Sequence, residues 1–308
     1  MIKLVVLGGS GMLGSMVVDV FQRDPEFELT ATVRTPVLAS DFGARIPDVQ
    51  WRLFDAASTT KDACVTAIAG AQWIINAVGI TKPYAHDDNP DEVENAIRIN
   101  SIFPYRLAAA AKETGARVLQ IATDCVYSGQ KGSYTESDPH DPLDVYGKTK
   151  SLGEVLHPGT HCLRCSIIGP EPKASVFLLE WFRRQMHSAR VNGFTNHQWN
   201  GVTTLQFAKL CMGIIKNDIP LSHLQHVIPT GTISKYEMLQ VFGKEFGRTD
   251  LQISPTEAKT VVDRTLSTTC EKRNCQLWAA AGYAHPPTVP EMIAELASFE
   301  YHFEGACA

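Results

Sequence analysis

The sequence has no apolar run long enough to cross a membrane and no cluster of basic residues. A spanning helix needs roughly 18 consecutive apolar residues, and no segment of the 308-residue chain approaches that length. Lysines and arginines form no run and the formal net charge is −5, which argues against a nucleic-acid groove. Glycines interrupt the apolar N-terminal stretch MIKLVVLGGSGMLG, unlike the core of a secretory signal. We therefore expect a cytoplasmic protein without nucleic-acid or membrane partners.

The cysteines show no spacing typical of a metal site. Eight are scattered along the chain, and only the pairs Cys162/Cys165 and Cys270/Cys275 are close in sequence. The first pair lies in THCLRCSII, which has the composition of a strand. Strand positions i and i+3 point to opposite faces, so these thiols form a poor metal clamp. We expect no metal, and interpret the cysteines as buried thiols in a reducing cytoplasm.

The first half of the chain alternates short apolar strands with helical stretches. Hydrophobic residues make up 44% and charged residues 20%, values typical of a soluble globular enzyme. Near-continuous apolar strands alternating with helices predict a parallel sheet covered on both faces. The expected fold is α/β, a Rossmann-type doubly wound sheet with a smaller C-terminal substrate-binding domain. Strands are predicted at 3–8, 27–34, 49–55, 71–79, 116–123 and 161–169, and helices at 12–23, 59–69, 90–114 and 146–156.

A glycine-rich turn follows the first predicted strand. LGGSGMLG places Gly8, Gly11 and Gly14 between that strand and the next helix. Glycines permit a tight turn and a close approach of the backbone to a pyrophosphate, and the helix N-terminus offers free N–H groups to the phosphates. A turn without a ligand is the alternative, but the strand–glycine–helix context favours dinucleotide binding. The predicted contacts in this loop are Gly8, Ser10, Gly11, Met12, Leu13 and Gly14.

The ends of the next strands suggest further cofactor contacts. Arg34 ends the second strand, where NAD-specific sites usually place an acidic residue. A guanidinium suits the 2′-phosphate of NADP, so we favour NADPH, with NADH as the alternative cofactor and a solvated arginine as the alternative role. Asp55 could accept from the adenine amino group or cap the following helix. Ala77, Val78 and Gly79 could lie against the cofactor or serve only in packing.

A tyrosine and a lysine in YGKTK carry the predicted chemistry. Tyr146 and Lys150 are spaced i, i+4 and so share a helix face. A nearby ammonium lowers the pKa of a phenol, which makes it a usable proton donor or acceptor. Thr123 ends the fifth strand, and ligands gather at the carboxyl ends of parallel strands. The pair alone could be a solvated helix face, but with Thr123 and the glycine turn it predicts a ketone/alcohol redox site.

The chain resembles the extended short-chain dehydrogenases/reductases, and within them the dTDP-4-dehydrorhamnose reductase family. The resemblance implies Thr123, Tyr146 and Lys150 as the catalytic residues, a 4-keto-6-deoxy sugar nucleotide as substrate and NADPH as hydride donor. It also implies that Asn100 supports the lysine, and that relatives pair through helices flanking the site, so a homodimer is plausible. The matching stretches are LGGSGMLG, NAVG, ATDCVYSGQKGSYTESDPHDPLDVYGKTKSLGE and LRCSIIGPE. They also contain Asp124, an expected substrate contact, and Ile168, an expected cofactor contact.

Cys125 is a departure that bears on the reaction. In the related GDP-fucose synthases a cysteine at a similar place serves epimerisation, together with a histidine beyond the sixth strand. The corresponding segment here, IIGPEPKASVF, contains no histidine. Dehydratase relatives carry an acid where Cys125 stands. We therefore expect reduction without epimerisation or dehydration.

Beyond Pro170 the pattern changes to shorter elements. FLLEWFRRQM and LQFAKLCMGII predict helices, HLQHVIPTG a strand, and VNGFTNHQWNGVTT a polar, aromatic loop. Trp199, Asn200 and Thr203 of this loop are expected substrate contacts, with a helix-capping loop as the alternative; His197 is expected to be structural or solvated rather than catalytic. We expect residues 1–168 to form an NAD(P)-binding Rossmann domain, to which segments near 200–228 return. Residues 169–308 would form mainly a substrate-binding cap.

Two other functions are compatible with this framework. A non-catalytic NADP-binding regulatory subunit, such as that of methionine adenosyltransferase, resembles the same family, but the intact Thr123, Tyr146 and Lys150 argue against it. A sugar-nucleotide epimerase would hold NAD tightly through an internal redox cycle, and Arg34 argues against that.

Overall fold

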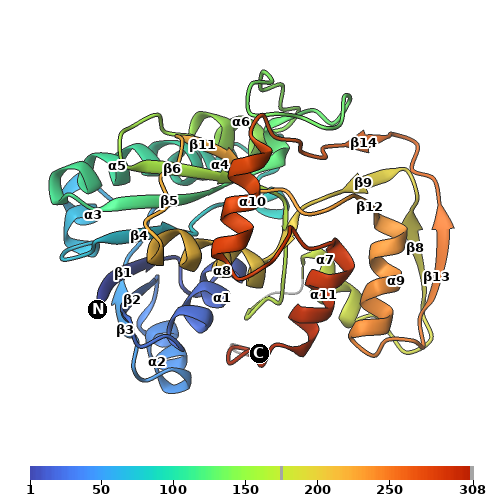
Figure 1. Ribbon diagram of the computed structural model, residues 1–308, viewed down its shortest axis with the longest axis horizontal. Coiled ribbons are helices and arrows are strands. Elements are labelled where there is room, and N and C mark those ends of the chain that lie inside the picture. Colours follow the sequence, from blue (N-terminus) through green and yellow to red (C-terminus); the bar gives the residue numbers. More distant parts are fainter. Residues whose placement is uncertain (174–175, 306–308) are drawn as a thin grey trace.

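A seven-stranded parallel sheet forms the centre of the molecule, for which a computed structural model describes residues 1–173 and 176–305 (Figure 1). Its strand order is β11-β6-β5-β4-β1-β2-β3, and every neighbouring pair is parallel. This order confirms the predicted Rossmann-type doubly wound sheet and places its switch point between β1 and β4. The strands are β1 (Ile2–Leu7), β2 (Phe27–Val33), β3 (Gln50–Leu53), β4 (Trp73–Asn76), β5 (Arg117–Ala122), β6 (Thr160–Arg164) and β11 (Leu224–His226).

Helices cover both faces of this sheet because its central strands are apolar on both sides. Along β1, Leu4 and Val6 belong to one buried apolar cluster, whereas Val5 and Leu7 belong to the other, as the two-residue period of a strand requires. Burying one such large side chain contributes about 1.5–3 kcal/mol. The first cluster includes residues of α1 (Met12–Phe21), α2 (Pro36–Arg45) and α8 (Thr204–Lys216); the second includes residues of α3 (Lys61–Ala67) and α5 (Phe103–Thr114).

The C-terminal part forms small sheets and helices beside the main sheet (Figure 1). The loop predicted at 192–204 is instead largely strands: β8 (Arg190–Phe194), β9 (His197–Trp199) and β10 (Val202–Thr203). Strand β8 pairs with β13 (Gln252–Thr256). Strand β9 pairs with β12 (Ile233–Ser234) and β14 (Val262–Asp263), and β10 pairs with β7 (Ile167–Ile168). These partners are distant in sequence, so local composition did not reveal them. The helices here are α7 (Leu178–Arg183), α9 (Lys235–Glu245), α10 (Glu271–Ala280) and α11 (Val289–Ser298).

The helix predicted at 90–114 is interrupted by a π-helical turn. It consists of α4 (Pro90–Ala96), the π-turn η2 (Ile97–Ile102) and α5. Pro104 has no N–H, so it cannot donate to the carbonyl of Asn100 as a regular helix would require. The Asn100 carbonyl faces the end of α6 (Val145–Leu152), where a Cβ on Gly153 would lie 1.8 Å from its oxygen. The π-turn therefore lets the helix that carries the YGKTK residues approach closely.

The structure corrects two further predictions and adds a helix that was not predicted. The helix predicted to reach residue 156 ends at Leu152, because Gly153 takes the C-cap position. Helix α2 was not predicted; Thr35 caps it by accepting from the Leu38 N–H. Cys270 and Cys275 are exposed rather than buried, whereas Cys64, Cys162, Cys165 and Cys211 are buried thiols, Cys125 is half-buried and Cys307 lies outside the described residues.

The segment around 200–228 joins the main sheet. Strand β11 pairs with β6, and α8 packs against α1. The domain boundary at residue 168 remains a prediction. Within the described ranges, no helix combines the length and apolar character needed to cross a membrane.

Candidate active site

A cavity of about 560 Å³ opens at the carboxyl ends of the parallel strands. Its lining comes from the turn after β1, the ends of β2 to β5, the start of α6 and the segment after β7. Its volume is within the usual range for small-molecule sites. The cavity brings together these predicted site residues: Gly8, Ser10, Gly11, Met12, Leu13, Arg34, Asp55, Val78, Gly79, Thr123, Asp124, Tyr146 and Lys150.

The glycine turn has the shape that a dinucleotide pyrophosphate requires. Gly8 has φ +81°, a conformation that side chains rarely adopt. A Cβ on Gly14 would lie 2.1 Å from the Gly8 carbonyl oxygen, so a side chain at this position would clash with the turn. Gly14 itself does not line the cavity. Helix α1 begins at Met12 without a side-chain cap on its first N–H groups. These uncapped donors and the helix dipole fit a phosphate group.

Arg34 and Asp55 line the cavity from the ends of β2 and β3. Arg34 is exposed, which leaves its guanidinium accessible to a ligand. The Asp55 carboxylate accepts from the Ala57 N–H at 3.1 Å and from the Ser58 hydroxyl at 3.0 Å. Asp55 therefore stabilises the turn after β3 and borders the cavity. The following helix α3 is capped by Thr60, so the predicted helix-capping role of Asp55 is wrong.

Thr123, Tyr146 and Lys150 meet in this cavity. The Thr123 hydroxyl accepts from the Cys125 N–H and donates to Asp124 Oδ1, both at 3.2 Å. Lys150, whose pKa is lowered by burial, donates from Nζ to the Ile121 carbonyl at 3.0 Å. The prediction that Lys150 lowers the Tyr146 pKa is wrong for this arrangement. Burial raises the pKa of Tyr146, a hydrogen bond with Thr123 only partly offsets that rise, and the phenol stays protonated at neutral pH.

Asn100 acts on the site from outside the cavity. Its Oδ1 accepts from the Ile80 N–H at 2.9 Å, and its Nδ2 donates to the Ile80 carbonyl at 2.9 Å and to the Thr149 hydroxyl at 3.1 Å. It therefore ties the loop after β4 to the helix that carries Lys150. Ala77 and Ile168 also lie outside the cavity; Ile168 pairs with Thr203 in a short sheet.

The three predicted substrate contacts of the cap do not line this cavity. Trp199 is buried beneath Lys235, whose ammonium lies 5.3 Å from the centre of the indole ring. Asn200 donates to the Leu266 carbonyl at 2.7 Å and accepts from the Leu266 N–H at 2.9 Å. Thr203 caps α8 by accepting from the Gln206 N–H. His197, expected to be structural, contacts the Thr260 carbonyl through Nε2 at 2.9 Å.

Several lining residues were missed in the sequence. Thr32, residues 80–84 and residues 165–167 follow or end strands, so the rule that ligands gather at strand ends could have found them. Lys173 carries no such signal. Its ammonium donates to the Ser10 hydroxyl at 2.6 Å, so a segment from beyond β7 reaches back to the glycine turn.

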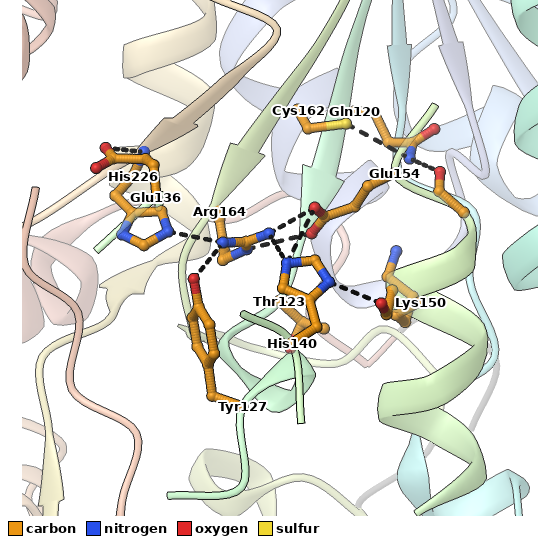
Figure 2. A network of polar contacts seen from close by, with 12 residues as sticks. Gln120, Thr123, Tyr127, Glu136, His140, Lys150, Glu154, Cys162, Arg164 and His226 are labelled. Carbon is orange, nitrogen blue, oxygen red and sulfur yellow. Dashed lines mark hydrogen bonds and ion pairs between the residues drawn. The ribbon is translucent and has the colours of Figure 1, made fainter. Parts of the chain in front are cut away.

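A buried polar network lies beside Thr123 and Lys150 (Figure 2). Arg164, at the end of β6, is fully buried and pairs with the Glu154 carboxylate, whose side chain is 7% exposed. The same guanidinium donates to the Tyr127 hydroxyl at 2.6 Å, to His140 Nε2 at 2.7 Å and to His226 Nε2 at 2.9 Å. Tyr127 and His140 belong to the chain between Thr123 and α6, and Glu154 follows α6. Arg164 thus joins the segments on both sides of the catalytic helix.

The unfolding free energy is expected to fall as the pH is lowered from 6.5 to 4. Burial and the neighbouring Arg164 charge lower the pKa of His226 from 6.5 to about 4. Within this window the unfolded chain binds the proton and the folded chain does not, so acidification favours unfolding. The shift corresponds to a loss of about 3 kcal/mol. Lowered pKa values of His140 and His223 act in the same direction.

Urea unfolding at several pH values would measure this loss. His226→Gln should flatten the dependence between pH 4 and 6.5, whereas the exposed His187→Gln should leave its slope unchanged. An equally steep slope in the His226 variant would assign the effect to other groups.

Part of the chain is similar in sequence to several known proteins. The dTDP-4-dehydrorhamnose reductase of Aggregatibacter actinomycetemcomitans is 31% identical over 159 residues, 51% of this chain and 47% of the relative. The spore coat polysaccharide biosynthesis protein SpsK of Bacillus subtilis is 39% identical over 85 residues, 27% of this chain and 29% of the relative. The β subunit of methionine adenosyltransferase 2 from Danio rerio is 29% identical over 188 residues, 56% and 57% of the two chains. The matches thus span well under two thirds of each relative.

Solved structures share the fold over almost the whole chain. The dTDP-4-dehydrorhamnose reductase of Bacillus anthracis in complex with NADP has a TM-score of 0.71 at 18% identity, covering 96% of this chain and 99% of that one. The UDP-glucuronic acid 4-epimerase of Bacillus cereus, in complex with UDP-glucuronic acid and NAD, has a TM-score of 0.74 at 12% identity and covers 99% of both chains. The model of the RmlD substrate binding domain family matches residues 2–298, and the chain therefore belongs to that family.

Proposed function

We propose that this protein is an NADPH-dependent reductase of a 4-keto-6-deoxy sugar nucleotide. The observation that carries the proposal is that one cavity is lined by the glycine turn, Arg34, Thr123, Tyr146 and Lys150. Groups suited to binding a cofactor and a proton donor therefore line the same cavity. A substrate would lie between them. The family membership and the names of the relatives support the same class of reaction.

The residues of the cavity are suited to NADPH. The backbone of the glycine turn and the start of α1 would hold the pyrophosphate, and Arg34 would pair with the 2′-phosphate. Lys150 would donate to the nicotinamide ribose hydroxyls, since its ammonium lies at the end of β5. When bound, NADPH would supply the hydride that reduces the C4 carbonyl.

Tyr146 would supply the proton for the reduced oxygen. Its raised pKa keeps the phenol protonated, which is the form that a reductase needs before the carbonyl accepts a hydride. The carbonyl carbon would gain the hydride, and the oxygen would take the phenolic proton. Thr123 would orient the carbonyl by turning its single hydroxyl proton from Asp124 Oδ1 to the same oxygen. Cys125 remains a protonated thiol, because burial raises its pKa to about 12, so it would not act as a base at neutral pH.

The direct test is oxidation of NADPH by the purified protein on addition of dTDP-4-keto-6-deoxyglucose or its UDP counterpart. The proposal predicts loss of NADPH absorbance in proportion to the sugar reduced. Binding of NADPH without turnover of either substrate would favour a regulatory subunit like the Danio rerio relative. Purification with tightly held NAD, and interconversion of sugars without net oxidation, would favour an epimerase.

A further inference from the structure

The helix that carries the catalytic residues is short and depends on its surroundings. Helix α6 has only 8 residues, and isolated helices shorter than roughly 12–15 residues are marginal in water. Asp144 secures its first turn, where the carboxylate accepts from the Gly147 N–H at 2.8 Å. Lys150 lies in its last turn, so the position of the Lys150 ammonium depends on the contacts at the carboxyl-terminal end of the helix.

Two buried side chains of the main sheet hold the residues that follow α6. Gln120 on β5 donates from Nε2 to the Gly153 carbonyl at 2.8 Å. Arg164 at the end of β6 donates from Nε to the Glu154 carboxylate at 3.2 Å. Both contacts lie beyond Leu152, the last residue of the helix.

His140 adds a contact to the last turn itself. Its Nδ1 lies 2.7 Å from the hydroxyl oxygen of Ser151, the residue next to Lys150. Its Nε2 lies 2.7 Å from a terminal nitrogen of the Arg164 guanidinium. Figure 2 shows the imidazole between Arg164 and the helix that carries Lys150. The imidazole therefore links the buried guanidinium to the catalytic helix.

The direction of these hydrogen bonds fixes the protonation state of His140. A guanidinium has five N–H donors and no acceptor. Arg164 donates all of them to its partners in the network of Figure 2. The His140 Nε2 therefore accepts, and its Nδ1 carries the proton that it donates to the Ser151 hydroxyl. The imidazole makes both contacts only in its neutral form.

The neighbouring groups decide where His140 titrates. Burial and the Arg164 charge oppose its protonation and lower its pKa from 6.5. The charges of Glu154, whose Oε2 lies 3.8 Å from His140 Nε2, and of Asp141 act in the opposite direction. Tyr127 packs edge-on against the imidazole, and burial raises the pKa of its phenol to about 12, so it adds no charge. His140 is thus mainly neutral at pH 7, but its side chain is 26% exposed and open to protons from solvent.

We propose that His140 is a positioning residue for Lys150. In its neutral form it joins the Arg164 guanidinium to Ser151 and so holds the last turn of α6 in place. Protonation turns the His140 Nε2 into a donor that faces the donors of Arg164, so the link to the helix breaks. The inference rests on the proposed function, in which Lys150 binds the nicotinamide ribose, and it adds a residue outside the cavity that makes this binding dependent on pH.

Amide hydrogen exchange measured by mass spectrometry tests the link without cofactor or substrate. His140→Leu and Ser151→Ala are each expected to raise the exchange rates of residues 148–153 about 2–10-fold at pH 7, the effect of losing one neutral hydrogen bond. His140→Gln should keep the wild-type rates, because its amide retains one acceptor and one donor. The exposed His187→Gln is the matched control and should equal the wild type. Exchange in the strands of the main sheet should not change in any of these variants.

The pH dependence of NADPH oxidation tests the effect on Lys150. Wild-type kcat/KM for the 4-keto sugar nucleotide should decline below pH 6.5 as His140 gains a proton. In His140→Gln, which cannot gain that proton, the decline should begin at a lower pH. His140→Leu and Ser151→Ala should have a kcat/KM that is about 2–10-fold below the wild type already at pH 7.5.

Three results would overturn the positioning role. One is the same acid decline in the wild type and in His140→Gln. Another is wild-type exchange of residues 148–153 in both His140→Leu and Ser151→Ala. The third is an equal increase in exchange throughout the main sheet, which would show a general loss of stability. Absence of NADPH oxidation by the wild type would refute the proposed function, whereas the exchange measurement would still decide whether His140 holds the helix.

Discussion

Replacing Tyr146 with phenylalanine is expected to lower turnover of a 4-keto sugar nucleotide about 10²–10⁴-fold, the range for losing a positioned proton donor. The substitution removes only the hydroxyl, and the ring continues to line the cavity. Nothing that would hold the pyrophosphate or the 2′-phosphate changes, so NADPH affinity should stay within a few-fold of the wild type. Initial rates of NADPH oxidation measure turnover, and a fluorescence titration measures NADPH affinity.

Tyr105→Phe is a matched control for this substitution. Tyr105 lies on α5, is 49% exposed and does not line the active-site cavity, so its hydroxyl should be dispensable. Wild-type turnover in the Tyr146 variant would refute the proton-donor role. A loss of NADPH binding together with turnover would instead show that the phenol holds the cofactor.

Replacing Arg164 with methionine is expected to destabilise the protein by about 3–5 kcal/mol, as measured by urea unfolding. The fully buried guanidinium compensates the Glu154 carboxylate and donates to Tyr127, His140 and His226 (Figure 2). Methionine fills similar volume but offers no donor, so a buried carboxylate would be left without its cation. The loss should exceed that at any exposed ion pair, because exposed pairs contribute only about 0–1 kcal/mol.

Two further variants separate the charge effect from general damage to the core. Arg164→Met combined with Glu154→Met removes both charges and should be less destabilising than Arg164→Met alone, because no unpaired ion remains. Arg98→Met breaks the exposed helical pair with Glu94 and should cost less than 1 kcal/mol. Arg164→Met within 1 kcal/mol of the wild type would contradict the stabilising role of the network.

The main sheet could be predicted because its signals are local. Near-continuous apolar strands such as KLVVLG, separated by helical stretches, require a sheet covered on both faces. The glycine turn follows β1, whereas Thr123 and the YGKTK helix both follow β5, and parallel connectivity places them at one edge. The cavity that joins Gly8, Thr123 and Tyr146 follows from this geometry, although sequence alone did not establish their roles.

The cap was less predictable because its order comes from distant partners. The 192–204 segment is polar and aromatic, so it was predicted as a loop, yet its strands pair with residues as far along the chain as 252–263. Trp199 and Asn200 were expected to contact substrate. Instead, the Trp199 ring lies under the Lys235 ammonium, and the Asn200 amide donates to the Leu266 carbonyl. Burial also reversed the expectation for Tyr146. Its i, i+4 spacing from Lys150 predicted a lowered phenol pKa, but burial of the phenol raises that pKa.

The sequence by itself determined the parallel sheet, the glycine turn and the set of polar residues at the strand ends, because these depend on short-range periodicity and on strand direction. Only the tertiary structure decided which side chains enter the cavity, how burial shifts their protonation, and that Arg164 joins the segments on both sides of the catalytic helix. Packing, desolvation and pairing between distant segments set those features. None of these three effects can be read from a short stretch of the sequence.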